Sequence, residues 1–214
     1  MRDFRPTRLE ILPTIIKNLI IINVLMFFAQ NTFAGVTSTF SVENYFALHA
    51  WKSDLFQPWQ MITHMFLHGS FWHLFGNMLA LWMIGSVLEN LWGPKNFLLF
   101  YLLCGLGAAA IHLLILSYRP ATSIDMATMG ASGGVFGILM AFVYLFPNTL
   151  FYIYFFFPIK AKWLGILYFG SELFMALQNN AGDNVARWAH VGGAIVGFLL
   201  VYIWKKTDKS NRWY

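Results

Sequence analysis

Charged residues are scarce in this sequence, and their scarcity narrows the class of protein. Only 11% of the 214 residues are Asp, Glu, Lys or Arg, whereas 58% are hydrophobic. Soluble domains are about a quarter charged and about half apolar. The composition therefore excludes an ordinary soluble enzyme, a disordered chain and a nucleic-acid binder. It indicates a polytopic membrane protein of one domain.

Cysteine is nearly absent as well. Cys104 is the single cysteine, which excludes an intramolecular disulfide and a thiolate metal cluster. No internal repeat is visible, which argues against a transporter built from two related halves. The net charge of +5 requires no acidic partner, because basic loop residues beside a membrane account for it.

Apolar runs of membrane length are abundant. They predict an all-α bundle of six transmembrane helices, with residues 1–214 forming a single membrane domain. Turn residues separate the runs, and the shorter apolar run 150–157 is expected at the inner interface. The predicted spans are 14–34, 71–91, 95–116, 131–146, 163–179 and 186–204.

The basic residues predict the orientation. With six spans, eleven of the fourteen Lys and Arg residues fall on one side of the membrane, which is the pattern of a cytoplasmic face. We therefore expect an inner (cell) membrane protein with both termini cytoplasmic, namely residues 1–13 and the basic tail 205–214. One alternative remains, because basic residues before the first span and small residues near Ala34 also fit a signal peptide.

Three polar residues are predicted at one depth in the membrane. Asn77, Ser132 and His190 each lie 14 residues before the inner end of their spans. At 1.5 Å per residue, each stands about 21 Å above the inner boundary. Polar groups at membrane depth are costly, so each is a functional candidate.

The spacing of glycines predicts that Ser132 and His190 meet. Small residues four apart allow two helices to approach closely, and His190 shares a face with such a pair. The pairs are Gly133 with Gly137 on the fourth span and Gly193 with Gly197 on the sixth. The fourth span is also short, so residues 117–130 are expected to enter the membrane and line a wet cavity.

A serine hydroxyl becomes a nucleophile when a base removes its proton. His190 is the predicted base for Ser132. No carboxylate on the fourth or sixth span is placed to orient the imidazole, so we expect a dyad rather than a triad. His73, Asn77 and the backbone N–H of Ser132 are the predicted oxyanion donors. Glu172 lies inside the fifth span without an assigned partner.

Two other interpretations of these residues are weaker. The run 130–134 fits G-x-S-x-G, but it follows a loop rather than the strand that an α/β-hydrolase requires. A metal site is not expected, because Asn77 and Ser132 are poor zinc ligands and no carboxylate completes a set. No cofactor is expected either.

The candidate residues stand within three motifs. The first carries His68, His73 and Asn77 with H-x₄-H-x₃-N spacing. The second is Gly130-Ala131-Ser132-Gly133, and the third is Ala189-His190-Val191-Gly192-Gly193 followed by Gly197. Over roughly residues 45–204, these motifs resemble the rhomboid family of intramembrane serine proteases, in the minimal six-helix form found in prokaryotes.

The resemblance implies a six-helix core with a Ser132–His190 dyad and with His73 and Asn77 as oxyanion donors. It implies that the substrate is a transmembrane segment of another protein, cut near the outer face. The fifth span and its outer loop, near 174–180, would be the gate, and the loop 35–58 would lie partly in the outer leaflet. The supporting residues implied are His68, Gly130, Gly133, Phe136, Gly193 and Gly197.

The sequence departs from the family at two places. Gln60 follows Trp59 where the family often has arginine, which affects a structural contact. Phe136 keeps the aromatic ring that often packs on the catalytic imidazole, but it lacks the hydroxyl found in some members.

Two functions of other classes remain. One is a catalytically silent, client-binding scaffold of the same fold. The other is a channel or transporter, which would require polar residues continuing to the inner face, where these spans become almost wholly apolar.

Overall fold

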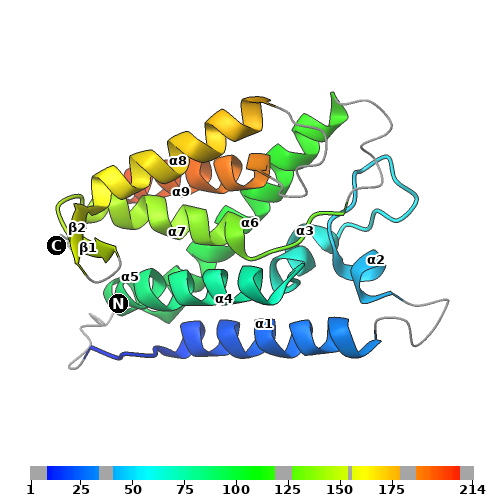
Figure 1. The fold of residues 1–214 in the computed structure, drawn as a ribbon, viewed down its shortest axis with the longest axis horizontal. Helices are drawn as coiled ribbons and strands as arrows, with labels where there is room; N and C mark the ends of the chain where they lie inside the picture. Colours follow the sequence, from blue (N-terminus) through cyan, green and yellow to red (C-terminus); the bar gives the residue numbers. More distant parts are fainter. Residues whose placement is uncertain (1–8, 34–40, 119–126, 154–155, 179–186, 208–214) are drawn as a thin grey trace.

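Helices dominate the computed structural model, as expected for a chain whose backbone must satisfy its own hydrogen bonds in lipid. The structure describes residues 9–33, 41–118, 127–153, 156–178 and 187–207. Figure 1 shows their arrangement. In chain order the elements are α1 (Thr14–Phe33), α2 (Val42–Phe46), α3 (Gln60–Thr63), the 3₁₀ helix η1 (His64–Phe66), α4 (Phe71–Ala80), the π-helical segment η2 (Leu81–Gly85), α5 (Ser86–Trp92), α6 (Pro94–Ser117), α7 (Ser132–Leu145), β1 (Leu150–Ile153), β2 (Phe157–Lys160), α8 (Ala161–Gln178) and α9 (Arg187–Thr207).

A helix occupies each of the six predicted spans, and every end agrees within three residues. The continuous helix α4–η2–α5 forms the second span. Within the described residues, four helices are long and apolar enough to cross a membrane: α1, α4–η2–α5, α6 and α9. The helix α7 is a shorter apolar helix, as its sequence predicted. The chain is thus an all-α, multi-pass membrane bundle.

Parts of five predicted features lie outside the described residues. They are positions 1–8 of the N-terminal segment, 35–40 of the first loop, 119–126 of the membrane-entering segment, 179–180 of the gate region and 208–214 of the basic tail.

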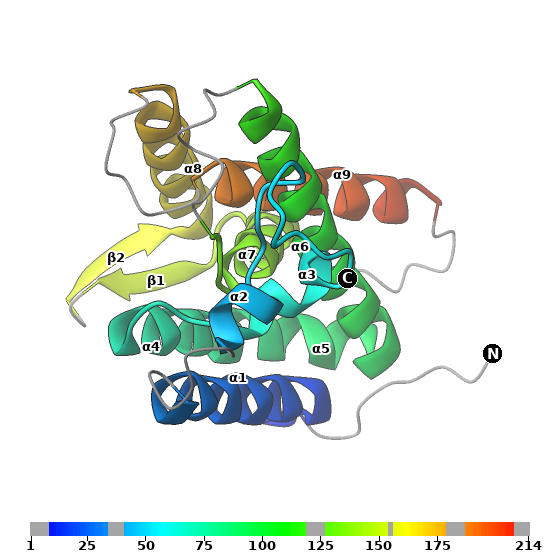
Figure 2. The same cartoon turned by 90° about the vertical axis from the view of Figure 1, so that its right-hand side faces the viewer.

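The centre of the bundle is α7. Figure 2 views it nearly end-on, with α4, α6, α8 and α9 around it. Most of its residues between Gly133 and Phe142 are buried. Because α7 is enclosed on all sides, polar groups at its first turn are held by neighbouring helices rather than by lipid.

A small β-hairpin follows α7, where the sequence predicted only an interfacial apolar run. Residues of β1 and β2 pair antiparallel, with Leu150 opposite Lys160 and Tyr152 opposite Pro158. Aromatic and β-branched residues favour strands, and proline is tolerated where an edge strand has no neighbour. The hairpin lies at the same end of the bundle as the start of α1 and the end of α9 (Figure 1).

Glu89 attaches α1 to the rest of the bundle. This residue on α5 is 3% exposed. Its carboxylate accepts hydrogen bonds of 2.9 Å from the backbone N–H groups of Ile15 and Ile16, in the first turn of α1. The first N–H groups of a helix lack partners within the helix and carry its positive dipole end. Glu89 therefore serves as a cap supplied by a different helix.

We expect Glu89→Ala to lower the free energy of unfolding by about 1–3 kcal/mol, because two buried donors lose their acceptor. Thermal unfolding in detergent, followed by tryptophan fluorescence, measures the change. Glu10→Ala is the matched control, since Glu10 is exposed and its contacts with Asn90 use backbone atoms. Equal unfolding temperatures for the two variants would contradict this role of Glu89.

Candidate active site

Ser132 is the first residue of α7, directly after the N-cap residue Ala131. The chain reaches it through Gly130, whose φ of +140° is a conformation that residues with a side chain rarely adopt. The N–H of Gly130 donates to the carbonyl of His64 over 2.9 Å. This local geometry places the Ser132 hydroxyl beside the positive end of a helix dipole.

His190 faces Ser132 from α9. Its Nε2 lies 2.7 Å from the Ser132 Oγ, so the predicted meeting of the two side chains is confirmed as geometry. The glycine pairs permit it: a Cβ atom at Gly193 would overlap the backbone carbonyl of Gly133, and one at Gly197 would overlap the backbone of Gly137. The two backbones are therefore in contact on the face that carries the imidazole, as small residues allow.

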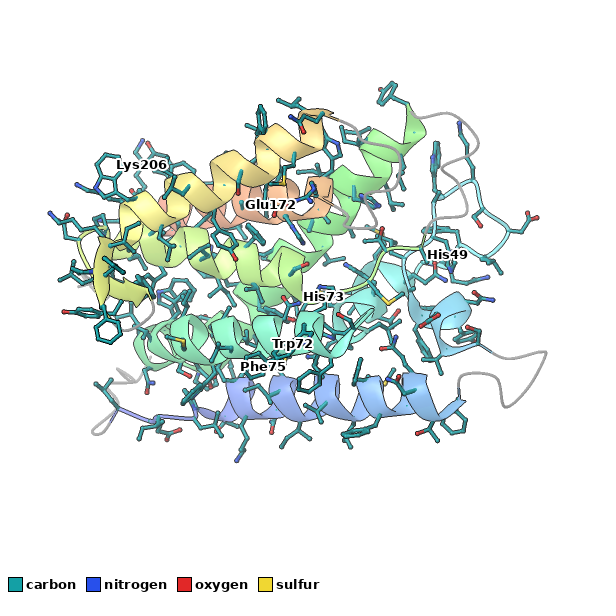
Figure 3. The ribbon with its side chains drawn as sticks, in the orientation of Figure 1. His49, Trp72, His73, Phe75, Glu172 and Lys206 are labelled. Carbon is teal, nitrogen blue, oxygen red and sulfur yellow. The ribbon has the colours of Figure 1, made fainter. Side chains whose placement is uncertain are left out.

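A carboxylate also contacts His190, contrary to the expectation of a two-residue arrangement. Glu172 of α8 has its Oε2 2.9 Å from the His190 Nδ1, and both of its oxygens lie 3.4 Å from the Arg187 Nη1. Glu172 occupies the place where α8 and α9 run side by side (Figure 3). The sequence predicts no such carboxylate on the fourth or sixth span, and it is the fifth span that supplies one.

A simple signal for Glu172 was present in the sequence. Glu172 lies six residues before the end of α8, and His190 lies three residues after the start of α9. These separations correspond to distances of about 9 Å and about 4.5 Å along each helix from those ends. A charged residue near the depth of the catalytic candidates is expected to have a partner there.

Phe136 packs on the imidazole, as the family resemblance implied. The rings of Phe136 and His190 are stacked, with centroids 4.5 Å apart and planes 11° from parallel. Phe136 stands one turn after Ser132 on α7. The imidazole is thus bounded by an aromatic face, a hydroxyl and a carboxylate, which restricts its rotation.

His73 approaches Ser132 from α4. A Cβ atom at Gly130 would lie 2.8 and 2.9 Å from the His73 Cε1 and Nε2, and 3.4 Å from the Ser132 Oγ. The glycine therefore leaves the space that the His73 ring occupies beside the hydroxyl. Ser70 begins α4 by accepting a hydrogen bond from the His73 N–H.

The His68 ring packs edge-on against the His73 ring. Their ring centroids are 5.0 Å apart. Burial lowers the pKa of His68 to about 3, with a smaller contribution from His73, so His68 is neutral at physiological pH. Its backbone N–H donates to the Gln30 Oε1 over 2.9 Å, which links this region to α1.

Asn77 lies one turn below His73 on α4 and is 6% exposed. Its side-chain amide donates to the His73 carbonyl over 2.9 Å. An amide has two N–H donors, and this bond uses one of them. Within the described residues, no direct hydrogen bond joins Asn77 to Ser132.

The first loop is held by Gln60, at one of the two departures from the family pattern. Gln60 is fully buried. Its amide nitrogen lies 2.9–3.4 Å from the backbone carbonyls of Leu55, Asn44 and Tyr45. Its amide oxygen accepts from the backbone N–H groups of His49 and Gln57. Leu48 in this loop pairs with Thr128, so the loop also holds the segment that leads to Ser132. Gln60 is structural here.

His64, His49 and His112 are all buried. The His64 Nδ1 lies 2.8 Å from the Gln60 carbonyl, and burial lowers the pKa of His64 to about 4. The His112 Nε2 lies 2.8 Å from the Thr128 hydroxyl. In the part of the chain that the structure describes, no group of three His, Cys, Asp or Glu side chains has the geometry to hold a metal ion.

Comparison with known proteins agrees with this architecture. Residues 55–207 match the family described as Rhomboid domain. The chain belongs to the rhomboid family. The matched region contains α3 to α9, and with them Ser132, His190, Glu172 and the His73–Asn77 turn.

Rhomboid relatives come from bacteria and from organelles. The chain is 28% identical to the rhomboid protease GluP of Bacillus subtilis, and the alignment covers 87% of this chain. It is 33% identical to the mitochondrial rhomboid protein 1 of Saccharomyces cerevisiae and 30% identical to the mitochondrial RHOMBOID-like protein 12 of Arabidopsis thaliana, each over 71% of this chain. The chain spans 34%, 44% and 47% of these three relatives, respectively.

Proposed function

We propose that this rhomboid is an intramembrane serine endopeptidase that cleaves transmembrane segments of other membrane proteins near the outer face. The observation that carries the proposal is the 2.7 Å contact between the Ser132 Oγ and the His190 Nε2. A base within hydrogen-bond distance is what activates a serine hydroxyl. The name of the relative GluP, a rhomboid protease, agrees with this reaction.

The chemistry follows from the atoms present. The His190 Nε2 takes the Oγ proton as Ser132 attacks the carbonyl carbon of the scissile peptide bond. The protonated imidazole then gives the proton to the leaving amine, and an acyl-enzyme remains. Water, activated by the same imidazole, releases the acid product and restores Ser132.

The developing oxyanion needs donors placed in advance. We assign this role to the Ser132 N–H, the His73 ring and the second N–H of the Asn77 amide. The position of Ser132 at the start of α7 supports the assignment, because an anion is stabilised at a helix N-terminus. Gly130 contributes by leaving space beside the hydroxyl for the His73 ring.

We further propose that both termini are cytoplasmic, in a plasma membrane. The start of α1 and the end of α9 lie at one end of the bundle (Figure 1), which supports an even number of crossings. The mitochondrial relatives make an organelle membrane the alternative location. We expect this reaction to require no metal ion or cofactor. The partners of the protein are the lipid bilayer and transmembrane protein substrates.

A fluorophosphonate probe tests whether Ser132 is activated. Purified protein in detergent is expected to be labelled on the peptide that contains Ser132, as identified by mass spectrometry, because only an activated serine reacts rapidly. Ser171→Ala is the control, since Ser171 is exposed on α8, and it should label like the native protein. Ser132→Ala should not label. A folded native protein that the probe does not label, and that does not cleave a transmembrane substrate, would overturn the proposal and favour the client-binding scaffold.

A further inference from the structure

Glu172 is a charged residue in an otherwise largely apolar helix. Its side chain is 14% exposed, and its two described partners lie one turn apart on α9, Arg187 and His190. A carboxylate at membrane depth is stable only when other groups compensate its charge. Arg187 supplies a full positive charge at 3.4 Å, so the pair allows Glu172 to remain ionised next to the imidazole.

The direction of the hydrogen bonds follows from the ionised carboxylate. A carboxylate only accepts, so the contact of 2.9 Å requires the proton of the neutral imidazole to be on Nδ1. The Nε2 then carries a lone pair, and it faces the Ser132 Oγ at 2.7 Å. Glu172 thereby selects the tautomer in which His190 can accept the serine proton.

We propose that Glu172 is a positioning residue that extends the dyad to a Ser132–His190–Glu172 triad. It holds the imidazole in the reactive tautomer and stabilises the imidazolium that forms when Ser132 gives up its proton. Glu172 acts through His190 and touches neither the substrate nor Ser132. This inference rests on the proposed protease function.

The surroundings favour this role over a purely structural ion pair. Phe136 covers one face of the His190 ring, and this stacking opposes rotation about the Cβ–Cγ bond but does not select between the two tautomers. The carboxylate at Nδ1 selects the tautomer, and it leaves Nε2 as the acceptor that faces the Ser132 hydroxyl. An Arg187–Glu172 pair without a catalytic role would not need the carboxylate to reach Nδ1.

The Glu172→Gln variant tests the proposal, because it keeps the shape of the side chain and removes its charge. A glutamine amide also presents N–H donors, which favour the opposite tautomer of His190. We expect kcat for a model transmembrane substrate to fall by about 10⁴-fold, the loss seen when a serine protease loses its orienting carboxylate. KM should change by less than about threefold, because Glu172 makes no substrate contact in this scheme.

Nitrogen-15 NMR of histidine-labelled protein provides a readout that a structural role would not change. The signals of His190 are identified by their loss in His190→Ala. The native protein is expected to show the Nδ1–H tautomer, and Glu172→Gln should show a population of the Nε2–H tautomer. Ser171→Ala, on the same helix and exposed, should match the native protein in tautomer, kcat and unfolding temperature.

The outcomes separate the two proposals. A native protein that neither labels nor cleaves refutes the proposed protease function, whatever the tautomer. If the native protein is active, a kcat of Glu172→Gln within about threefold of native refutes the role of Glu172. A lower kcat with an unchanged tautomer refutes the selection of the tautomer by Glu172, since only the effect of its charge on the imidazolium would then account for the loss.

Discussion

Replacement of Ser132 by alanine is expected to lower kcat for cleavage of a transmembrane substrate by about 10⁴–10⁶-fold. His190→Ala should cause a loss of the same order, because the hydroxyl at 2.7 Å is a poor nucleophile without its base. The measurement is cleavage of a fluorogenic transmembrane substrate in detergent micelles, with single-turnover rates for the slow variants.

The double variant, Ser132→Ala with His190→Ala, gives the sharper test. Residues that act as a unit show strongly non-additive losses, so the double variant should be no slower than the slower single variant. Additive losses would mean that the two side chains act independently, which would contradict the proposed mechanism. Unfolding temperatures near native for all three proteins would exclude misfolding as the cause.

A single methyl group at Gly193 is expected to lower the free energy of unfolding by at least about 2 kcal/mol. The added Cβ of Gly193→Ala would overlap the backbone carbonyl of Gly133. Backbone atoms cannot rotate away as a side chain does, so α7 and α9 would have to separate. The same displacement would draw His190 away from Ser132, and kcat should fall with stability.

Gly170→Ala is the matched control for Gly193→Ala. It makes the same chemical change in α8, where an added Cβ meets no atom within 4 Å. Alanine stabilises a helix interior by about 1 kcal/mol relative to glycine, so the two variants should shift the unfolding temperature in opposite directions. If Gly193→Ala also raised the unfolding temperature, the close contact of α7 and α9 would not be needed for stability.

Much of the fold could be predicted from local sequence alone. Apolar runs of membrane length and the turn residues between them predicted all six helices, because a chain in lipid must satisfy its backbone within each segment. The hairpin at Leu150–Lys160 was missed, because a short apolar run does not reveal by itself whether it forms a strand or an interfacial helix. Only its pairing partner, β2, decides that.

Part of the site could also be predicted. Depth along a helix follows from counting residues, and the helix face follows from the 3.6-residue period. These two quantities placed His190 opposite Ser132, and the glycine pairs identified the helices that touch. The family motifs added His68 and Phe136, whose rings lie against His73 and His190, respectively.

What the sequence by itself determined is which residues share a depth and a helix face, because both quantities depend on spacing within one segment. The tertiary structure alone decided which side chains face one another across helices, since this depends on how each helix is rotated against its neighbours. Glu172 shows the difference: its charge was visible in the fifth span, but its contact with His190 required the packing of α8 on α9. Gln60 is similar, because its five backbone partners converge only in the folded loop.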